Sequence, residues 1–81
     1  MISTPSSASY LDLRGTPCPV NFVRCCIAIE DLSYEEHFEV YLDKGEPEEM
    51  VISGLKKKGH HVDIIQKYST WVRLIVVCGV R

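Results

Sequence analysis

The sequence has no long apolar run and no surplus of basic residues. No stretch approaches the roughly 18 to 20 apolar residues that a bilayer-crossing helix needs, and the opening MISTPSSASY lacks the basic start and apolar stretch of a signal peptide. We therefore expect no membrane segment and a cytoplasmic location. Nine Lys and Arg against eleven Asp and Glu give a formal net charge of −2, which disfavours direct binding to nucleic-acid phosphates.

Signatures of cofactor, hydrolytic and metal sites are also missing. No Gly-rich phosphate loop, Ser-His-Asp arrangement or pair of catalytic carboxylates stands out. His60, His61 and Cys78 lack the spacing of the three or four ligands of a typical zinc site. The basic run 56–58 suits the negative end of a helix dipole. We predict no cofactor and no metal.

The length and composition fit one small domain. With 81 residues, 46% of them hydrophobic and 25% charged, the chain can bury about 63% of its unfolded surface, enough for one modest core. Residues 1–9 are rich in Ser and predict a disordered lead-in, and residues 10–81 form the domain. In a reducing cytoplasm the four cysteines are expected to be thiols.

Six secondary-structure elements follow from periodicity and from helix and turn signals. The second helix is the best marked, with Pro47 and three Glu residues at its start, lysines in its last turn and Gly59 just beyond. The predicted elements are a strand at Tyr10–Leu13, a helix at Pro19–Leu32, a strand at His37–Leu42, this second helix, and strands at His61–Tyr68 and Trp71–Cys78.

The order βαβαββ predicts an α/β (α+β) two-layer sandwich, a mixed four-stranded sheet with both helices on one face, because strand–helix–strand units favour right-handed parallel crossovers. This topology brings Cys18, the segment Asp43–Glu46 and the turn Tyr68–Trp71 to one end. The strand Trp71–Cys78 has apolar residues at both its odd and its even positions, and so on both faces of the sheet. The face without helices should therefore expose an apolar patch. Such a patch favours a homodimer or a docked partner.

Cys18 is the main candidate for chemistry. It lies at or next to the N-cap of the first helix, where free N–H groups and the helix dipole stabilise an anion, and Arg14 could add positive charge. The alternative is a purely structural role, in which Cys18 is a small, partly buried residue before a proline. Cys25 and Cys26 lie about 10 to 12 Å along the helix, too far for a disulfide with Cys18, and are expected to pack in the core.

The segment Leu11-Asp12-Leu13-Arg14-Gly15-Thr16-Pro17-Cys18-Pro19 closely resembles the signature of the TusA-like (SirA/YedF) sulfur-carrier family. The resemblance implies that Cys18 carries sulfur as a persulfide. It implies a protein donor, a cysteine desulfurase or rhodanese-like protein, and a protein acceptor, for example in tRNA thiolation. The neighbouring motif residues Asp12, Arg14, Gly15 and Pro19 then take supporting roles.

One position departs from the family pattern. The family usually has Cys-Pro-x-Pro, whereas this chain has Asn21 in place of the second proline. With Cys18 as N-cap, Asn21 is the third helical residue, whose N–H points back at the cap side chain. We expect this N–H to donate a hydrogen bond to the Cys18 sulfur.

The sequence therefore predicts a sulfurtransferase-like persulfide relay at Cys18 rather than a free-standing enzyme. Two alternatives remain open: a non-catalytic regulatory or interaction module of the same fold, and a thiol redox sensor. Tyr68, Trp71 and Lys44 are candidates for partner contact, because they lie at the same end of the fold as Cys18.

Overall fold

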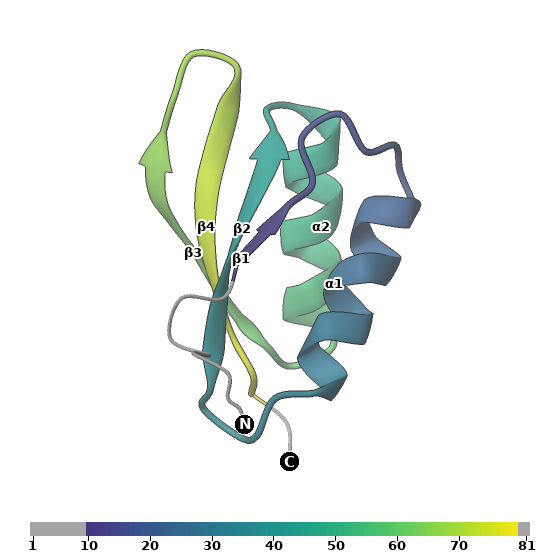
Figure 1. Cartoon of the computed structure of the whole chain (residues 1–81), viewed down its shortest axis with the longest axis vertical. Helices are drawn as coiled ribbons and strands as arrows, with labels where there is room; N and C mark the ends of the chain where they lie inside the picture. Colours follow the sequence, from purple (N-terminus) through teal and green to yellow (C-terminus); the bar gives the residue numbers. More distant parts are fainter. Residues whose placement is uncertain (1–9, 80–81) are drawn as a thin grey trace, which may run out of the picture.

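A computed structural model describes residues 10–79. The six predicted elements are all present, and their observed ends differ from the predicted ones by at most two residues (Figure 1). The predicted lead-in, residues 1–9, lies outside the described residues. The elements are β1 (Tyr10–Asp12), α1 (Val20–Glu30), β2 (His37–Asp43), α2 (Glu46–Lys57), β3 (His61–Lys67) and β4 (Trp71–Val77).

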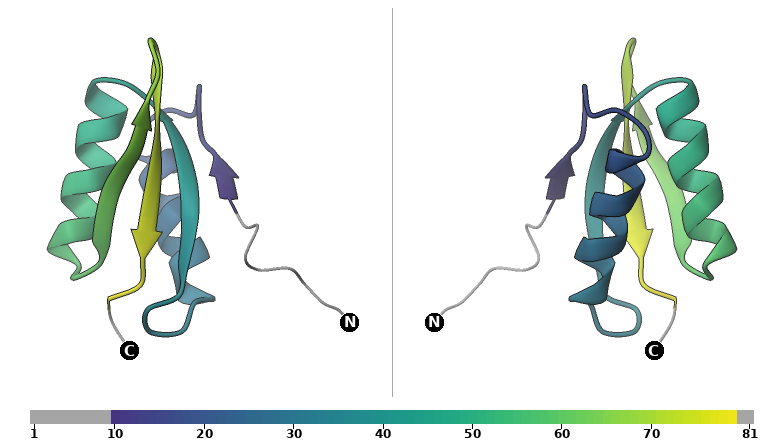
Figure 2. Two further views of the ribbon diagram at one scale, coloured as in Figure 1. Left: turned by 90° about the vertical axis from the view of Figure 1, so that its left-hand side faces the viewer. Right: turned by 90° about the vertical axis from the view of Figure 1, so that its right-hand side faces the viewer.

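The four strands form one mixed sheet in the order β1-β2-β4-β3. β1 pairs with β2 in parallel, and β4 pairs antiparallel with both β2 and β3. Both helices cover the same face, and no helix or strand within residues 10–79 covers the other face (Figure 2). The predicted βαβαββ two-layer sandwich is therefore confirmed.

The core lies between the sheet and the two helices. Val72, Leu74 and Val76 of β4 are buried on the helix side, whereas Trp71 and Ile75 alternate with them on the open side and are half-buried. This period of two is what a sheet with one covered face requires. Further core side chains come from β2 and both helices: Phe38, Val40, Leu42, Cys25, Ile29, Val51 and Leu55.

The two helices approach closely at Gly54 of α2. A Cβ atom at this position would lie 2.5 Å from the Phe22 ring of α1, so only glycine leaves room for the ring as it stands. The start of α2 is capped locally, because Glu48 accepts the N–H of Gly45 at 3.3 Å. Acidic residues fill its first turn and lysines its last turn, as the helix dipole favours.

The strand directions gather three segments at one end of the molecule. β1 and β2 are parallel, so the loop that follows β1 and the turn that follows β2 lie at the same edge, together with the β3–β4 hairpin (Figure 1). Residue 18 belongs to the first of these segments. The topology therefore places the candidate cysteine among side chains that are distant in sequence.

Candidate functional site

Cys18 is an exposed thiol in the loop between β1 and α1. It precedes Pro19, the N-cap of α1, through a cis peptide bond, and the helix begins at Val20. The prediction that Cys18 lies at or next to the N-cap is confirmed, since the cap falls on its neighbour. Cys18 is therefore an exposed residue directly before the N-cap of a helix.

The N–H groups in the first turn of α1 are mostly occupied. The Asn21 N–H donates to the Pro17 carbonyl at 3.1 Å and the Val23 N–H to the Pro19 carbonyl at 3.0 Å. The Phe22 N–H donates to Asn21 Oδ1 at 2.6 Å. Within residues 10–79 the Val20 N–H makes no hydrogen bond, so it is the first-turn donor left for an incoming anion.

The predicted hydrogen bond from the Asn21 N–H to the Cys18 sulfur is wrong. The prediction counted Cys18 as the N-cap, but the cap is Pro19, which makes Asn21 the second helical residue and directs its N–H to Pro17. The side chain of Asn21 is fully buried, and its Nδ2 has no hydrogen-bond partner among the described residues. Asn21 is thus an inward-facing polar residue at the base of the loop.

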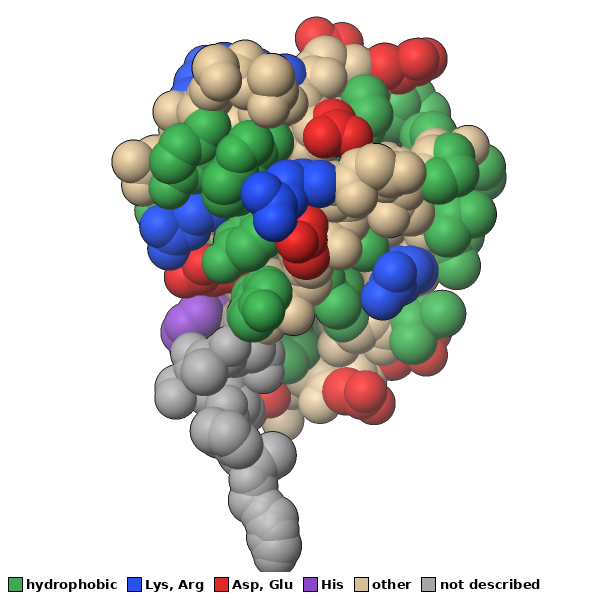
Figure 3. Space-filling model, turned by 45° about the horizontal axis from the view of Figure 1, so that its top comes forward, with side chains coloured by type: hydrophobic (Ala, Val, Ile, Leu, Met, Phe, Trp, Pro, Cys, Tyr) green, Lys and Arg blue, Asp and Glu red, His purple; other side chains and the backbone are tan. Residues whose placement is uncertain are grey.

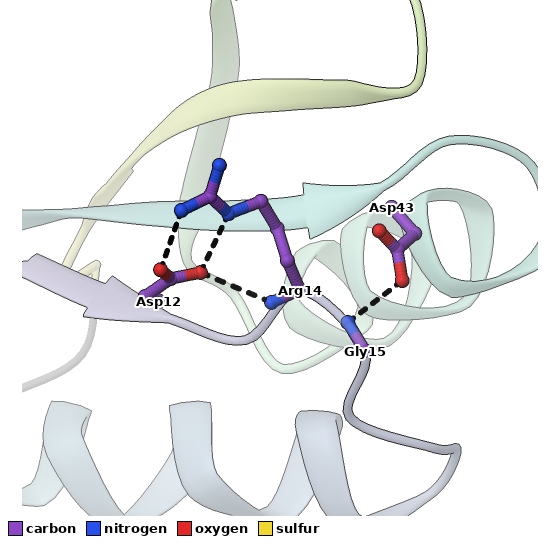
Figure 4. Close-up of polar contacts among 4 residues, drawn as sticks. All are labelled: Asp12, Arg14, Gly15 and Asp43. Atoms are coloured by element: carbon purple, nitrogen blue, oxygen red, sulfur yellow. Dashed lines mark hydrogen bonds and ion pairs between the residues drawn. The ribbon is translucent and has the colours of Figure 1, made fainter.

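Asp12 and Arg14 form a tight pair at the start of the Cys18 loop (Figure 4). Arg14 Nε donates to Asp12 Oδ1 at 2.8 Å, Arg14 Nη2 donates to Asp12 Oδ2 at 2.6 Å, and the Arg14 N–H also reaches Asp12. The hydrogen bonds from Arg14 lower the pKa of Asp12 to about 2. Because the guanidinium is held by a carboxylate, the pair neutralises itself locally.

A second carboxylate, which sequence reasoning placed at this end but gave no role, ties the same loop to the sheet. Asp43, the last residue of β2, accepts the Gly15 N–H at 2.8 Å (Figure 4). Gly15 has a φ of +78°, a conformation that glycine adopts readily. Asp43 ends a strand that runs parallel to β1, and this signal could have pointed to a contact with the loop.

The open face of the sheet carries a row of aromatic rings. Tyr10 stacks on Tyr41 at 5.2 Å between centroids, Tyr41 meets Trp71 at 5.1 Å, and Tyr68 stacks on Trp71 at 4.2 Å. The Arg14 guanidinium lies over the Trp71 ring, 4.3 Å from its centroid. The predicted partner-contact residues Tyr68 and Trp71 are therefore held together beside the motif residue Arg14.

The predicted apolar character of the open face is only partly right. Trp71, Ile75 and Val77 are half-buried there, but Arg73 and Glu39 form an ion pair across the same face at 3.0 Å. Hydrophobic, basic and acidic side chains are intermixed at the end near the Cys18 loop (Figure 3). Lys44, the third predicted contact residue, is exposed at this end, and its N–H donates to the Thr70 carbonyl.

The other thiols lie in different surroundings. Cys25 is fully buried, and this burial raises the pKa of its thiol to about 12. Cys26 and Cys78 line a cavity of about 450 Å³ together with His60, whose pKa is lowered mainly by burial. Among residues 10–79 no group of three or more His, Cys, Asp and Glu side chains could hold a metal ion.

The site combines an exposed thiol with a helix start and a loop anchored to the sheet. The family described as "Sulfurtransferase TusA" matches residues 9–77. The chain therefore belongs to the TusA sulfurtransferase family, whose members generally relay sulfur between protein partners.

A solved structure supports the fold. The chain is similar to the crystal structure of a SirA-like protein from Desulfitobacterium hafniense, with a TM-score of 0.75 and 18% sequence identity. The similarity covers 86% of this chain and 96% of the other. No match was found among curated proteins. Within residues 10–79, neither helix has the length and apolar character needed to cross a bilayer.

Proposed function

We propose that this protein relays sulfane sulfur as a persulfide on Cys18. The Cys18 thiolate attacks the outer sulfur of a donor persulfide, R–S–SH. The new Cys18 S–S bond forms as the donor S–S bond breaks, and R–S⁻ leaves with the electron pair. An acceptor thiolate or other nucleophile then attacks the outer sulfur of Cys18–S–SH and releases the Cys18 thiolate. No external oxidant or reductant is consumed.

The observation that carries this proposal is the exposure of Cys18 at the start of α1. Exchange between sulfur atoms needs an accessible nucleophile, and it needs no deep substrate cavity. The exposed thiol lies next to the N-cap of α1, where the Val20 N–H has no hydrogen-bond partner among residues 10–79. The loop anchored at Gly15 presents the sulfur in a defined place.

Membership of the TusA family suggests the partners. A persulfide donor of this kind is a cysteine desulfurase or a rhodanese-like protein, and the acceptor is a second protein, for which tRNA thiolation is one destination. No disulfide joins the cysteines within residues 10–79, which suits a reducing compartment such as the cytoplasm. The formal net charge of −2 gives no support for contact with RNA itself.

Loading with sulfur tests the proposal. The protein is incubated with a cysteine desulfurase and L-cysteine, and its intact mass is measured. We expect the mass of one added sulfur atom in the wild type and in the control Cys26→Ala, and no addition in Cys18→Ala. Addition that persists in Cys18→Ala would overturn the assignment.

The same assay separates the two alternatives. A wild-type protein that gains no sulfur would contradict the relay and favour a regulatory or interaction module. Sulfenic acid formed at Cys18 with peroxide, in a protein that takes up no sulfur, would favour a redox sensor.

A further inference from the structure

Two side chains outside the Cys18 motif hold the motif loop on the sheet. The first is Asp43, whose Oδ2 accepts the Gly15 N–H at 2.8 Å across a separation of 28 residues. Gly15 is three residues before Cys18. Three residues of extended chain span roughly 10 Å, so the anchored Gly15 lies within about that distance of the Cys18 backbone. On its other side Cys18 leads directly into Pro19 and α1. The cysteine is therefore held between two fixed points.

The second side chain is Trp71. One side of its ring carries the Arg14 guanidinium at 4.3 Å, and its ring also stacks with Tyr68 at 4.2 Å. Arg14 in turn bonds Asp12 through two side-chain nitrogens. Arg14 is thus fixed by a carboxylate and by an aromatic ring at once, and it is the residue directly before Gly15.

The two anchors are neighbours on the sheet. Asp43 and Trp71 stand opposite each other in the β2–β4 register. Asp43 accepts a hydrogen bond from the backbone of Gly15, and Trp71 packs against the side chain of Arg14. Paired positions on two neighbouring strands therefore bind two consecutive residues of the loop. Gly15 adopts a positive φ that most other residues would resist.

We propose that Asp43 and Trp71 are positioning residues for sulfur transfer at Cys18. This inference rests on the proposed relay. Attack on a persulfide needs the two sulfur atoms aligned, and a displacement of about 1 Å can slow a bimolecular transfer by about 100-fold. Neither residue touches the transferred sulfur in this scheme; each acts through the loop.

The test of Asp43 uses a loss, a rescue and a matched control. In Asp43→Ala the Gly15 N–H has no acceptor, and we expect sulfur loading from a cysteine desulfurase with L-cysteine to slow by about tenfold or more. Asp43→Asn keeps a carbonyl oxygen for this N–H and should restore most of the rate. Glu39→Ala removes another carboxylate from the same face of β2, one that binds Arg73, and should load within about twofold of the wild type.

A parallel pair tests Trp71. Trp71→Ala removes the surface under Arg14 and should slow loading, whereas Trp71→Phe keeps a ring face for the guanidinium and should recover most of the rate. These two Trp71 variants test the proposal if Asp43→Ala fails to fold. Loading at the wild-type rate in folded Asp43→Ala and Trp71→Ala would overturn the proposal, as would an Asp43→Asn variant as slow as Asp43→Ala.

Amide hydrogen exchange at Gly15 keeps this proposal distinct from the relay. We expect the Gly15 N–H to exchange slowly in the wild type and in Asp43→Asn, and rapidly in Asp43→Ala, while the core strands stay protected in all three. Unchanged exchange in Asp43→Ala would contradict the positioning role. A wild-type protein with this exchange pattern that takes up no sulfur would contradict the relay and leave the anchored loop established.

Discussion

Two cysteines seven residues apart show how the fold decides the chemistry of a thiol. Cys18 lies in a loop at the start of α1 and is exposed, whereas Cys25 lies inside α1 and is completely buried. Burial raises the pKa of Cys25 to about 12 from its usual value of 9.0. The same side chain is therefore a surface nucleophile in one region and a piece of apolar core in the other.

Alkylation in the folded state should give the largest contrast between these regions. The higher pKa leaves Cys25 with about one thousandth of the thiolate of an ordinary thiol. With iodoacetamide near pH 8 we expect Cys18 to react readily and Cys25 to react only after unfolding, as read by peptide mass. Labelling of Cys25 at a rate comparable to Cys18 in the folded protein would break the comparison.

Stability should show the opposite order. Cys25→Ser places a hydroxyl in the core among side chains such as Ile29 and Val51, and we expect a loss of about 1–3 kcal/mol in the free energy of unfolding. Cys18→Ser changes an exposed loop position and should alter this free energy by no more than about 0.5 kcal/mol. Urea unfolding followed by circular dichroism measures both, and equal losses would argue against the difference in burial.

The smallest effect concerns the pH dependence of the loop. The folded-state pKa of Asp12, about 2, lies below its usual 3.8. The Asp12–Arg14 pair therefore stabilises the loop above about pH 4, and this contribution is lost as the pH falls through about 2. We expect the Arg14 Nε–H signal in nuclear magnetic resonance to titrate with that midpoint and to show no such step in Asp12→Asn. A midpoint near 4 would contradict a persistent pair.

Much of this arrangement could be predicted from local sequence signals. The period of two in β4, the glutamates and lysines at the ends of α2, and Pro19 before a helical pattern fixed the elements to within two residues. The placement of both helices on one face of a mixed sheet then followed from the handedness of crossover connections. The position of Cys18 at a helix start was predicted from the proline that follows it.

Contacts between distant residues were harder to predict. The hydrogen bond from Gly15 to Asp43 depends on the position of the loop relative to the end of β2. No local sequence pattern specifies that position. The Asn21 prediction failed because a shift of the N-cap by one residue redirects an N–H to a different acceptor. The open face of the sheet is less apolar than the alternation of residues in β4 indicated, because Glu39 of β2 forms an ion pair with Arg73 of β4.

The central claim, that Cys18 carries the sulfur, is tested most directly by locating the added atom. After loading with a cysteine desulfurase and L-cysteine, the thiols and persulfides are alkylated and the protein is digested with trypsin. Cleavage after Arg14, Arg24 and Lys44 separates Cys18 from Cys25 and Cys26. We predict one additional sulfur atom in the peptide Gly15–Arg24 and none in the peptide Cys25–Lys44. Sulfur found in the second peptide, with Gly15–Arg24 unmodified, would contradict the account.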